Sequence, residues 1–378
     1  MKTRTKTASI IYMLFVVSYI AGRVWSVPHI IANLLVAGVG LCAWVYCFFK
    51  RGLCSKNKTL IAFGLLFTVM MIASIFYNGN ADILDVFWIW AYAGIAALIY
   101  EFEVPQKICW LGVGFFAVLI CFHIISGGAP RDFLSMGSEN NISACLIFFI
   151  LVAYLAQSPK KKLLNHIPTL FCLFVCLWTG SRGGSLAAIV LMVCVAAHNV
   201  LSLKKGRTIA LLKIFVAFVL VLAGVAIFFS EYMTAFVEKM DQYGGKSVRT
   251  EIWAEYINAS FESVGNFLLG VNTTDPTLEM LSFYSGNPHN SFLILHANLG
   301  IIACFLIFAL YIKVISKARK EKNAVIIIVL IAASARMFFD WIAFTGVFDV
   351  LFWYMLLYAT DTKEKDGCST IDLQEKYK

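Results

Sequence analysis

Charged residues are scarce in this sequence. Of its 378 residues, 14% are charged and 60% are hydrophobic, whereas about a quarter of the residues in a soluble domain are charged. A chain with so little charge does not form a water-soluble globule. Since one membrane-spanning helix needs about 20 mostly apolar residues, the long apolar runs predict an all-α integral membrane protein.

Prolines and mid-membrane charges are also few. The seven prolines lie in predicted loops or at the ends of predicted spans, and apart from histidines and Asp349 no ionisable residue falls clearly in the middle of a span. Broken helices and charges within the bilayer are typical of transporters. The sequence pattern therefore counts against a flippase or another transporter, and a purely structural or sensory membrane protein is favoured still less.

Two common devices for binding phosphate are missing. No two aspartates stand at D-x-D spacing, which excludes the usual metal clamp for a nucleotide-sugar diphosphate. Gly245, Lys246 and Ser247 imitate the end of a phosphate-binding loop, but Met240 stands where that loop needs its first glycine. Any phosphate chemistry must therefore use arginines, and we expect neither a metal nor a cofactor.

The eleven cysteines do not predict a disulfide framework. Cys54 and Cys368 lie in segments that we place in the cytoplasm, where thiols stay reduced. The other nine lie within apolar runs, where cysteine packs as a small hydrophobic residue. We expect no disulfide and no cysteine-based metal site.

Apolar runs separated by polar breaks predict about twelve spans. We divide the chain into spans one to nine (1–229), a large extracytoplasmic loop domain with an amphipathic helix (230–290), spans ten to twelve (291–360) and a tail (361–378). The predicted spans are 8–22, 30–49, 59–77, 86–100, 108–126, 140–157, 168–180, 185–201, 209–229, 291–312, 324–336 and 343–360.

Basic residues predict the orientation. Of the 31 lysines and arginines, Lys213 lies within a span, and most of the others fall in the termini and in alternate loops. Because cytoplasmic loops are rich in lysine and arginine, we place both termini in the cytoplasm. The net charge of +9 is spread over short clusters between spans, which excludes a nucleic-acid surface. The basic residues on the outer side are Arg23, Arg131, Arg182, Lys239, Lys246, Arg249 and Arg336.

The loop at 230–290 is long enough to fold over the membrane surface. Ser247 is expected to cap a helix on which Trp253, Tyr256, Ile257 and Phe261 recur at helical spacing. This stripe either packs on the helix bundle or the lipid headgroups, or offers a platform on which a sugar stacks.

Arg182 lies in a glycine-rich turn between two predicted spans, flanked by Ser181 and Gly183. Glycines let backbone N–H groups approach an anion, and the next helix begins here, so a phosphate would meet helix N-terminal amides and a guanidinium group. The alternative is a tight hairpin whose arginine reaches the lipid headgroups.

Two further residues are candidates for the same site. Arg249 begins the loop helix, where it either contacts phosphate or pairs with Glu251 or Glu255. His289, followed by Asn290, stands just before the tenth span, where its imidazole would lie at the same outer surface as Arg182. Arg336 with Asp340 is read as a structural ion pair, and His296 as a core residue.

These segments together resemble the O-antigen ligase and polymerase superfamily, membrane enzymes that move glycans from a polyprenyl-diphosphate carrier to another acceptor. The resemblance covers roughly residues 179–303. It rests on Ser181-Arg182-Gly183 with Leu186, on Arg249 with Trp253, and on His289-Asn290 followed by Gly300. The chain departs from the family pattern at Asn272, where a glycine often follows Gly270 at this spacing, and at Ala303, where glycine or a small polar residue is usual.

The resemblance implies a GT-C-like glycosyltransferase in a bacterial inner membrane. It implies that Arg182 and Arg249 bind the donor diphosphate and that His289 accepts a proton from the attacking hydroxyl, with inversion at the sugar carbon. It also implies that Ser181, Gly183, Trp253 and Asn290 help to bind substrate.

The leading functional interpretation is a polymerase that joins lipid-linked repeat units into a surface polysaccharide. The alternative is a ligase that transfers the finished glycan to a lipid core or a protein, because both enzymes use the same donor. The expected partners are a polyprenyl-diphosphate-linked oligosaccharide donor, a glycan or lipid-core acceptor and membrane lipids, together with flippase and chain-length regulator proteins.

Overall fold

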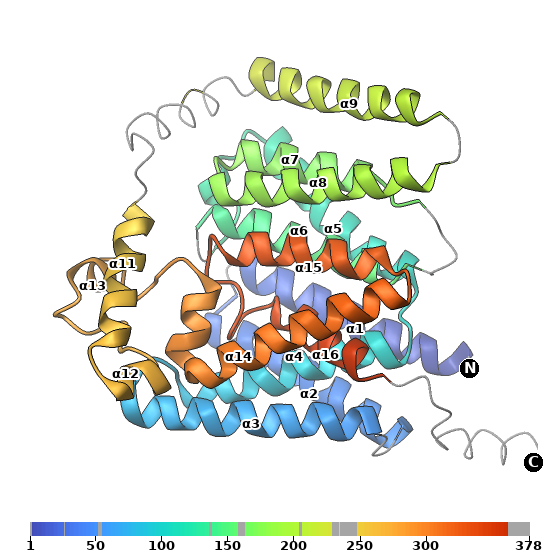
Figure 1. Cartoon of the computed structure of the whole chain (residues 1–378). Coiled ribbons are helices and arrows are strands. Elements are labelled where there is room, and N and C mark those ends of the chain that lie inside the picture. The colour runs from blue at the N-terminus through green and yellow to red at the C-terminus, as the bar shows by residue number, and fades with distance from the viewer. Residues whose placement is uncertain are drawn as a thin grey trace, which may run out of the picture.

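The computed structural model describes residues 2–25, 27–51, 55–135, 138–157, 163–203, 206–228, 234 and 248–361 (Figure 1). Within these residues the regular structure is helical, and one apolar helix overlies each predicted span in the predicted order. These helices are α1 (Lys2–Val24), α2 (His29–Arg51), α3 (Ser55–Asn78), α4 (Ile83–Glu101), α5 (Gln106–Ile125), α6 (Asn140–Leu155), α7 (Ile167–Trp178), α8 (Arg182–Ser202), α9 (Arg207–Phe228), α14 (Ser291–Lys320), α15 (Ala324–Met337) and α16 (Asp349–Thr360).

The helices differ in length. Helices α1 to α5, α8 and α14 are long and apolar enough to cross a membrane, whereas α6, α7, α15 and α16 are apolar but have 10–17 residues. A helix of 12 residues such as α16 is about 18 Å long, shorter than a hydrocarbon core of about 30 Å. The all-helical membrane class is therefore confirmed, and the full set of about twelve spans stays a prediction.

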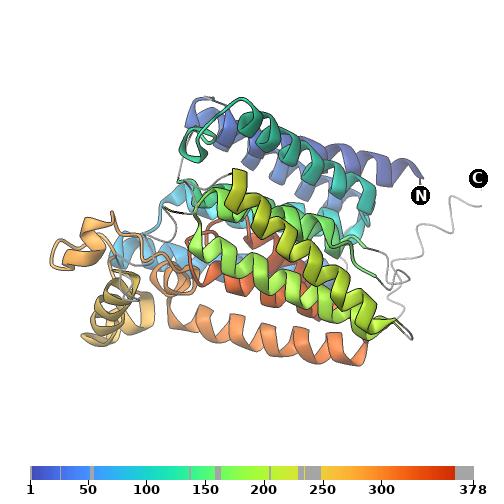
Figure 2. The same ribbon diagram turned by 90° about the horizontal axis from the view of Figure 1, so that it is seen from above.

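The apolar helices run along a common direction, and the small helices of the large loop lie at one end of the bundle (Figures 1 and 2). At the opposite end, the Tyr46 hydroxyl donates to the Arg4 carbonyl (3.0 Å). There also the Lys317 ammonium donates to the Tyr358 carbonyl (2.5 Å). The start of α1 and the end of α16 therefore lie at the same end of the bundle, as an even number of spans requires.

Helix α6 lies at the centre of the bundle. Every residue from Ile142 to Leu155 is buried, because neighbouring helices, including α5, α7, α8 and α15, surround it. A helix that is apolar on all sides is typical of such a position.

Nine cysteines, all in described residues, are free thiols.

The described part of the large loop, residues 248–290, holds α11 (Val248–Phe261), α12 (Val264–Leu269) and α13 (Glu279–Phe283). The predicted cap Ser247 lies outside the described residues. The buried face of α11 is formed by Ile252, Tyr256 and Ala259, which pack with Leu281 in a small separate core. Ile257 and Phe261, which belong to the predicted stripe, are 46% and 72% exposed, so a contact of these two side chains with lipid headgroups or a sugar stays a prediction.

Helix α14 is broken at Gly300, so the expectation that no span is interrupted was wrong. Gly300 has φ 75° and ψ 179°, a backbone conformation that is essentially restricted to glycine. The prolines, on which the expectation rested, do not mark this break. Residues before Gly300 run in a different direction from the long helix after it (Figure 1). Helix α14 thus begins at Ser291, the predicted start of the tenth span, and changes direction at Gly300.

The predicted start of the last span, 343–360, was wrong, because α16 begins at Asp349. The residues before it form an irregular, largely buried segment. Ser291 Oγ accepts hydrogen bonds from the N–H groups of Ile342 (3.0 Å) and Ala343 (3.2 Å), and Asn298 Nδ2 donates to the Phe344 carbonyl (2.8 Å). Non-helical backbone is tolerated at membrane depth only where protein groups satisfy it in this way.

The predicted orientation can be tested with two matched cysteine variants. Ser282 in α13 and Ser316 near the end of α14 are both exposed and lie at opposite ends of the bundle. In a chain without its natural cysteines, a membrane-impermeant maleimide should label Ser282→Cys in spheroplasts and label Ser316→Cys only after lysis. The reverse pattern would place the large loop in the cytoplasm and invert the topology.

Candidate active site at the end of the bundle that carries the large loop

Arg182 begins α8 at the turn predicted to bind an anion. Ser181, just before it, is buried, and its Oγ accepts hydrogen bonds from the Gly184 N–H (3.2 Å) and from Ser143 Oγ (3.3 Å). Arg182 and Gly183 are half-buried. Ser181 therefore supports the turn from inside the bundle, whereas the side chain of Arg182 and the first N–H groups of α8 lie nearer the surface.

Gly183 allows two other segments to approach this turn closely. A Cβ atom at Gly183 would lie 2.6 Å from Phe339 Cβ and 3.7 Å from Arg249 Nη1. The first distance is too short for two carbon atoms, so any side chain would displace the segment that follows α15. The second distance is an ordinary contact and shows that the Arg249 guanidinium of α11 lies beside the turn that carries Arg182.

Trp253 anchors α11 to the segment that carries the candidate histidine. Its indole N–H donates to the Pro288 carbonyl (2.7 Å), and its ring packs edge-to-face on Phe338 with 5.1 Å between ring centroids. Of the two predicted roles, the structure shows the packing contact for Trp253. A contact with sugar stays a prediction for its half-buried ring.

The backbone holds His289 in a fixed position. Its φ of 50° lies in the left-handed region, which costs energy for a residue other than glycine. The His289 N–H donates to Asn287 Oδ1 (2.8 Å), and the next residue, Asn290, caps α14 by accepting from the N–H groups of Phe292 and Leu293. Asn290 is buried, so its side chain serves the helix start.

Asp340 lies beside the His289 ring. Its Oδ1 atom is 3.9 Å from His289 Nδ1, and its Oδ2 atom is 2.9 Å from Arg336 Nη2. Arg336, which is 1% exposed, also donates to the Asn140 carbonyl (3.0 Å). The predicted pairing of Arg336 with Asp340 is confirmed. The approach of Asp340 to His289 was not predicted from the sequence. The available signal was the position of Asp340, one helical turn after Arg336 at a helix end that was predicted to lie on the same side as His289.

Charges on the surrounding segments act on both Arg249 and Asp340. Burial lowers the pKa of Arg249, the Asp340 carboxylate opposes that effect, and the Arg336 and Arg182 charges lower it further. Burial raises the pKa of Asp340, but the His289 imidazole and the Arg336 guanidinium outweigh burial and bring it well below its usual value. Asp340 is therefore ionised at neutral pH, and two guanidinium groups, those of Arg336 and Arg249, and the His289 imidazole all lower its pKa.

The candidate residues divide by burial. Arg182, Gly183, Arg249, Trp253 and His289 are half-buried, so ligand can reach them, whereas Ser181 and Asn290 are buried and cap helices. The structure thus brings α8, α11 and the start of α14 together at one end of the bundle. His296 lies apart from this group, where it bonds with the Tyr256 hydroxyl (2.7 Å) and the Phe267 carbonyl (2.9 Å), which confirms its reading as a core residue.

Replacing Gly183 by alanine tests the close approach of these segments. The added carbon would have to displace Phe339, and overpacking of this kind costs about 1–3 kcal/mol, so the melting temperature in detergent should fall. Gly114→Ala is the matched control, because Gly114 lies in a helix where an added Cβ atom would meet nothing within 4 Å. Equal melting temperatures for the two variants would contradict the packing described for Gly183.

Part of the chain, from α7 into α14, matches a known protein family. Residues 167–308 match the O-antigen ligase family. The matched region begins with α7 and contains the Arg182 turn, the described part of the large loop and the break at Gly300. No curated protein matches the chain. The match confirms the resemblance predicted from the sequence, so residues 167–308 of this membrane protein carry a domain of the O-antigen ligase and polymerase superfamily.

Proposed function

We propose that this protein is a metal-independent glycosyltransferase that polymerises polyprenyl-diphosphate-linked repeat units on the outer side of a bacterial inner membrane. The observation that carries the proposal is the convergence of Arg182, Arg249 and the His289–Asp340 pair at one end of the bundle. Within a domain of this superfamily, such a group provides both an anion site and a base.

The two half-buried arginines are suited to the donor diphosphate. Guanidinium groups donate paired hydrogen bonds to phosphate oxygens. Arg182 stands at the start of α8, where the first N–H groups of a helix favour an anion, and the Arg249 guanidinium lies beside the same turn. In the proposed reaction these charges stabilise the polyprenyl diphosphate as it leaves the sugar.

His289 is suited to be the general base. With Nδ1 protonated and facing the Asp340 carboxylate, Nε2 is left to accept the proton of the acceptor hydroxyl. The acceptor oxygen then forms a bond to the anomeric carbon, the bond from that carbon to the diphosphate oxygen breaks, and the configuration inverts. Asp340 stabilises the His289 imidazolium that results. The imidazolium then gives its Nε2 proton to solvent.

The ligase alternative uses the same donor site and differs in the acceptor. A polymerase adds the glycan to a second lipid-linked repeat unit, and a ligase adds it to a lipid core or a protein. We retain the polymerase as the leading proposal, with flippase and chain-length regulator proteins as working partners. A transporter is less favoured because it gives the histidine, the acid and the arginines at the outer end no chemical role.

Arg182→Lys tests the diphosphate contact. An ammonium group cannot donate two parallel hydrogen bonds to phosphate, and a lost charge-assisted bond of about 1.5–3 kcal/mol corresponds to a roughly ten- to hundredfold lower transfer rate. The measurement is glycan transfer by purified protein at matched protein levels. Arg131→Lys is the control, since Arg131 is 82% exposed beside Asp132. Near-normal transfer by Arg182→Lys would favour a lipid headgroup anchor instead.

His289→Ala tests the base. Without a proton acceptor the turnover should fall roughly a hundredfold or more, while binding of the lipid-linked donor stays nearly unchanged. His198→Ala on the same bundle is the control, because His198 is half-buried in α8 away from the turn. Loss of donor binding with retained turnover would make His289 a phosphate ligand. His296→Ala should lower stability, since two hydrogen bonds are lost.

A further inference from the structure

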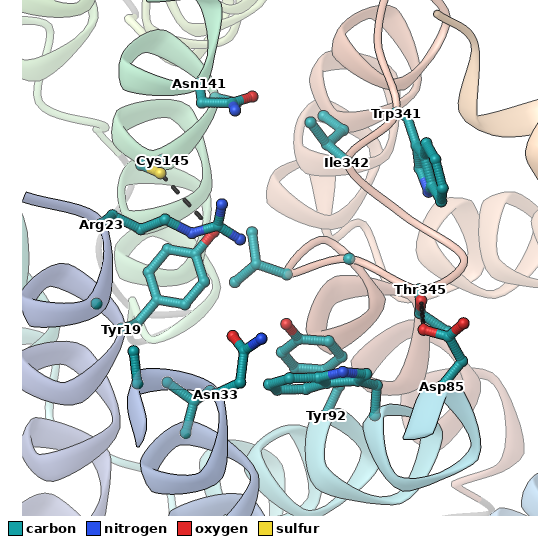
Figure 3. A pocket seen from close by; sticks show the side chains of 17 residues that line it. Tyr19, Arg23, Asn33, Asp85, Tyr92, Asn141, Cys145, Trp341, Ile342 and Thr345 are labelled. Atoms are coloured by element: carbon teal, nitrogen blue, oxygen red, sulfur yellow. Dashed lines mark hydrogen bonds between the residues drawn. The ribbon is translucent and has the colours of Figure 1, made fainter. Parts of the chain in front are cut away.

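A polar cavity lies beside the segment that follows Asp340. It has a volume of about 490 Å³ and is enclosed by α1, α2, α4, α6 and residues 341–347 (Figure 3). This volume falls within the range of about 300–1,000 Å³ that is typical of small-molecule sites. None of the residues singled out in the proposed mechanism lines this cavity.

Arg23 is the cation of this cavity. Its side chain extends from the end of α1 into the space, over the ring of Tyr19 at 5.5 Å from the ring centroid (Figure 3). Its backbone carbonyl accepts two hydrogen bonds from Ser135 (2.8 and 3.0 Å), which fix the position of the chain. In the part of the chain that the structure describes, no carboxylate lies within ion-pair distance of Arg23.

The one acid that lines the cavity is already committed to protein contacts. Asp85 Oδ1 accepts a hydrogen bond from the Thr345 hydroxyl (2.7 Å), and its Oδ2 accepts from the Asp82 N–H (2.8 Å) at the start of α4. Both carboxylate oxygens therefore stabilise local structure. Arg23 thus stands in a cavity with room for an external anion, and a half-buried guanidinium favours such a partner.

The rest of the lining combines aromatic rings with amides. Trp88 stacks on Tyr92 with 5.4 Å between ring centroids and 23° between planes. Trp341 lines another wall, and Asn141 of α6 lines the cavity across from it (Figure 3). Aromatic faces pack against the apolar face of a sugar ring, and amides donate to and accept from its hydroxyls. This lining fits a sugar better than a bare inorganic ion.

The cavity and the candidate active site share a wall. Asp340 approaches His289 on one side, and Trp341, the next residue, lines the cavity on the other. In the same way Asn140 accepts from Arg336, while Asn141 faces the cavity. A sugar held in the cavity would therefore lie one segment away from the proposed base.

We propose that this cavity binds an acceptor substrate whose sugar carries an anionic group. This group, which is a phosphate or a carboxylate, pairs with Arg23 while the sugar ring packs against Trp341. The assignment to the acceptor rests on the proposed glycosyl transfer, but binding of an anionic sugar does not. The phosphate and the carboxylate share this chemistry, and separate probes distinguish them.

Binding to the purified full-length protein is measured by ligand-observed NMR with glucose 1-phosphate, glucuronate, glucose and inorganic phosphate. We expect one or both anionic sugars to bind at least tenfold more tightly than glucose or inorganic phosphate. Arg23→Gln should weaken that binding tenfold or more, and Trp341→Ala should weaken it too. Arg131→Gln should leave it unchanged. Arg23→Lys, which keeps the charge, replaces Arg23→Gln if the latter does not fold, and is expected to bind more weakly than the natural protein.

The proposal is overturned if glucose binds as tightly as the anionic sugars. It is also overturned if inorganic phosphate binds as tightly as they do and Trp341→Ala has no effect, or if Arg182→Gln abolishes the binding and Arg23→Gln does not. In transfer assays, Arg23→Gln should raise the KM for the acceptor about tenfold or more and leave the KM for the donor unchanged. An altered donor KM with normal acceptor KM would overturn the acceptor assignment. Normal transfer by His289→Ala would instead overturn the proposed function and leave the binding result intact.

Discussion

The buried carboxylate of Asp340 is the constraint on which the end of the bundle that carries the large loop depends. A charge in an apolar environment is tolerated only when it is paired and hydrogen-bonded, and Asp340 has Arg336 at 2.9 Å and the His289 imidazole at 3.9 Å. Its backbone carbonyl also accepts from Ser291 Oγ (2.7 Å). One residue therefore ties the end of α15 to the start of α14 and orients the candidate base. Stability and proposed chemistry depend on the same carboxylate.

The break at Gly300 explains how the start of α14 reaches Asp340. A break leaves carbonyl groups without their helical partners, and here the Ala297 carbonyl accepts hydrogen bonds from Ser74 Oγ, Asn78 Nδ2 and Asn80 Nδ2 at 2.9–3.1 Å. The polar end of α3 thus replaces the missing helical bonds. Because residues 291–299 are freed from the direction of the long helix, His289 and Asn290 lie over the bundle end, where the large loop packs.

The sequence predicted those features of the fold that depend on the apolar runs and on their spacing. The order of the helices and the arrival of Arg182, Arg249 and His289 at one end follow from counting polar breaks, because each crossing reverses the chain direction. The break at Gly300 and the irregular residues 341–348 did not follow, because hydropathy does not register whether distant groups such as Ser74 and Ser291 satisfy the backbone. The contact of Asp340 with His289 and the cavity at Arg23 depend on the same tertiary packing.

An arginine-based phosphate site demands more rigidity of the protein than a metal site does, because each guanidinium must be carried to its place by its own segment. Arg182 is placed by the helix that Ser181 caps. Arg249 belongs to α11, which the bond from Trp253 to the Pro288 carbonyl (2.7 Å) joins to the segment of His289. The segments that carry Arg249 and His289 are therefore joined directly by this hydrogen bond. This coupling would keep the proposed phosphate contact and base in register while a long glycan passes over the membrane surface.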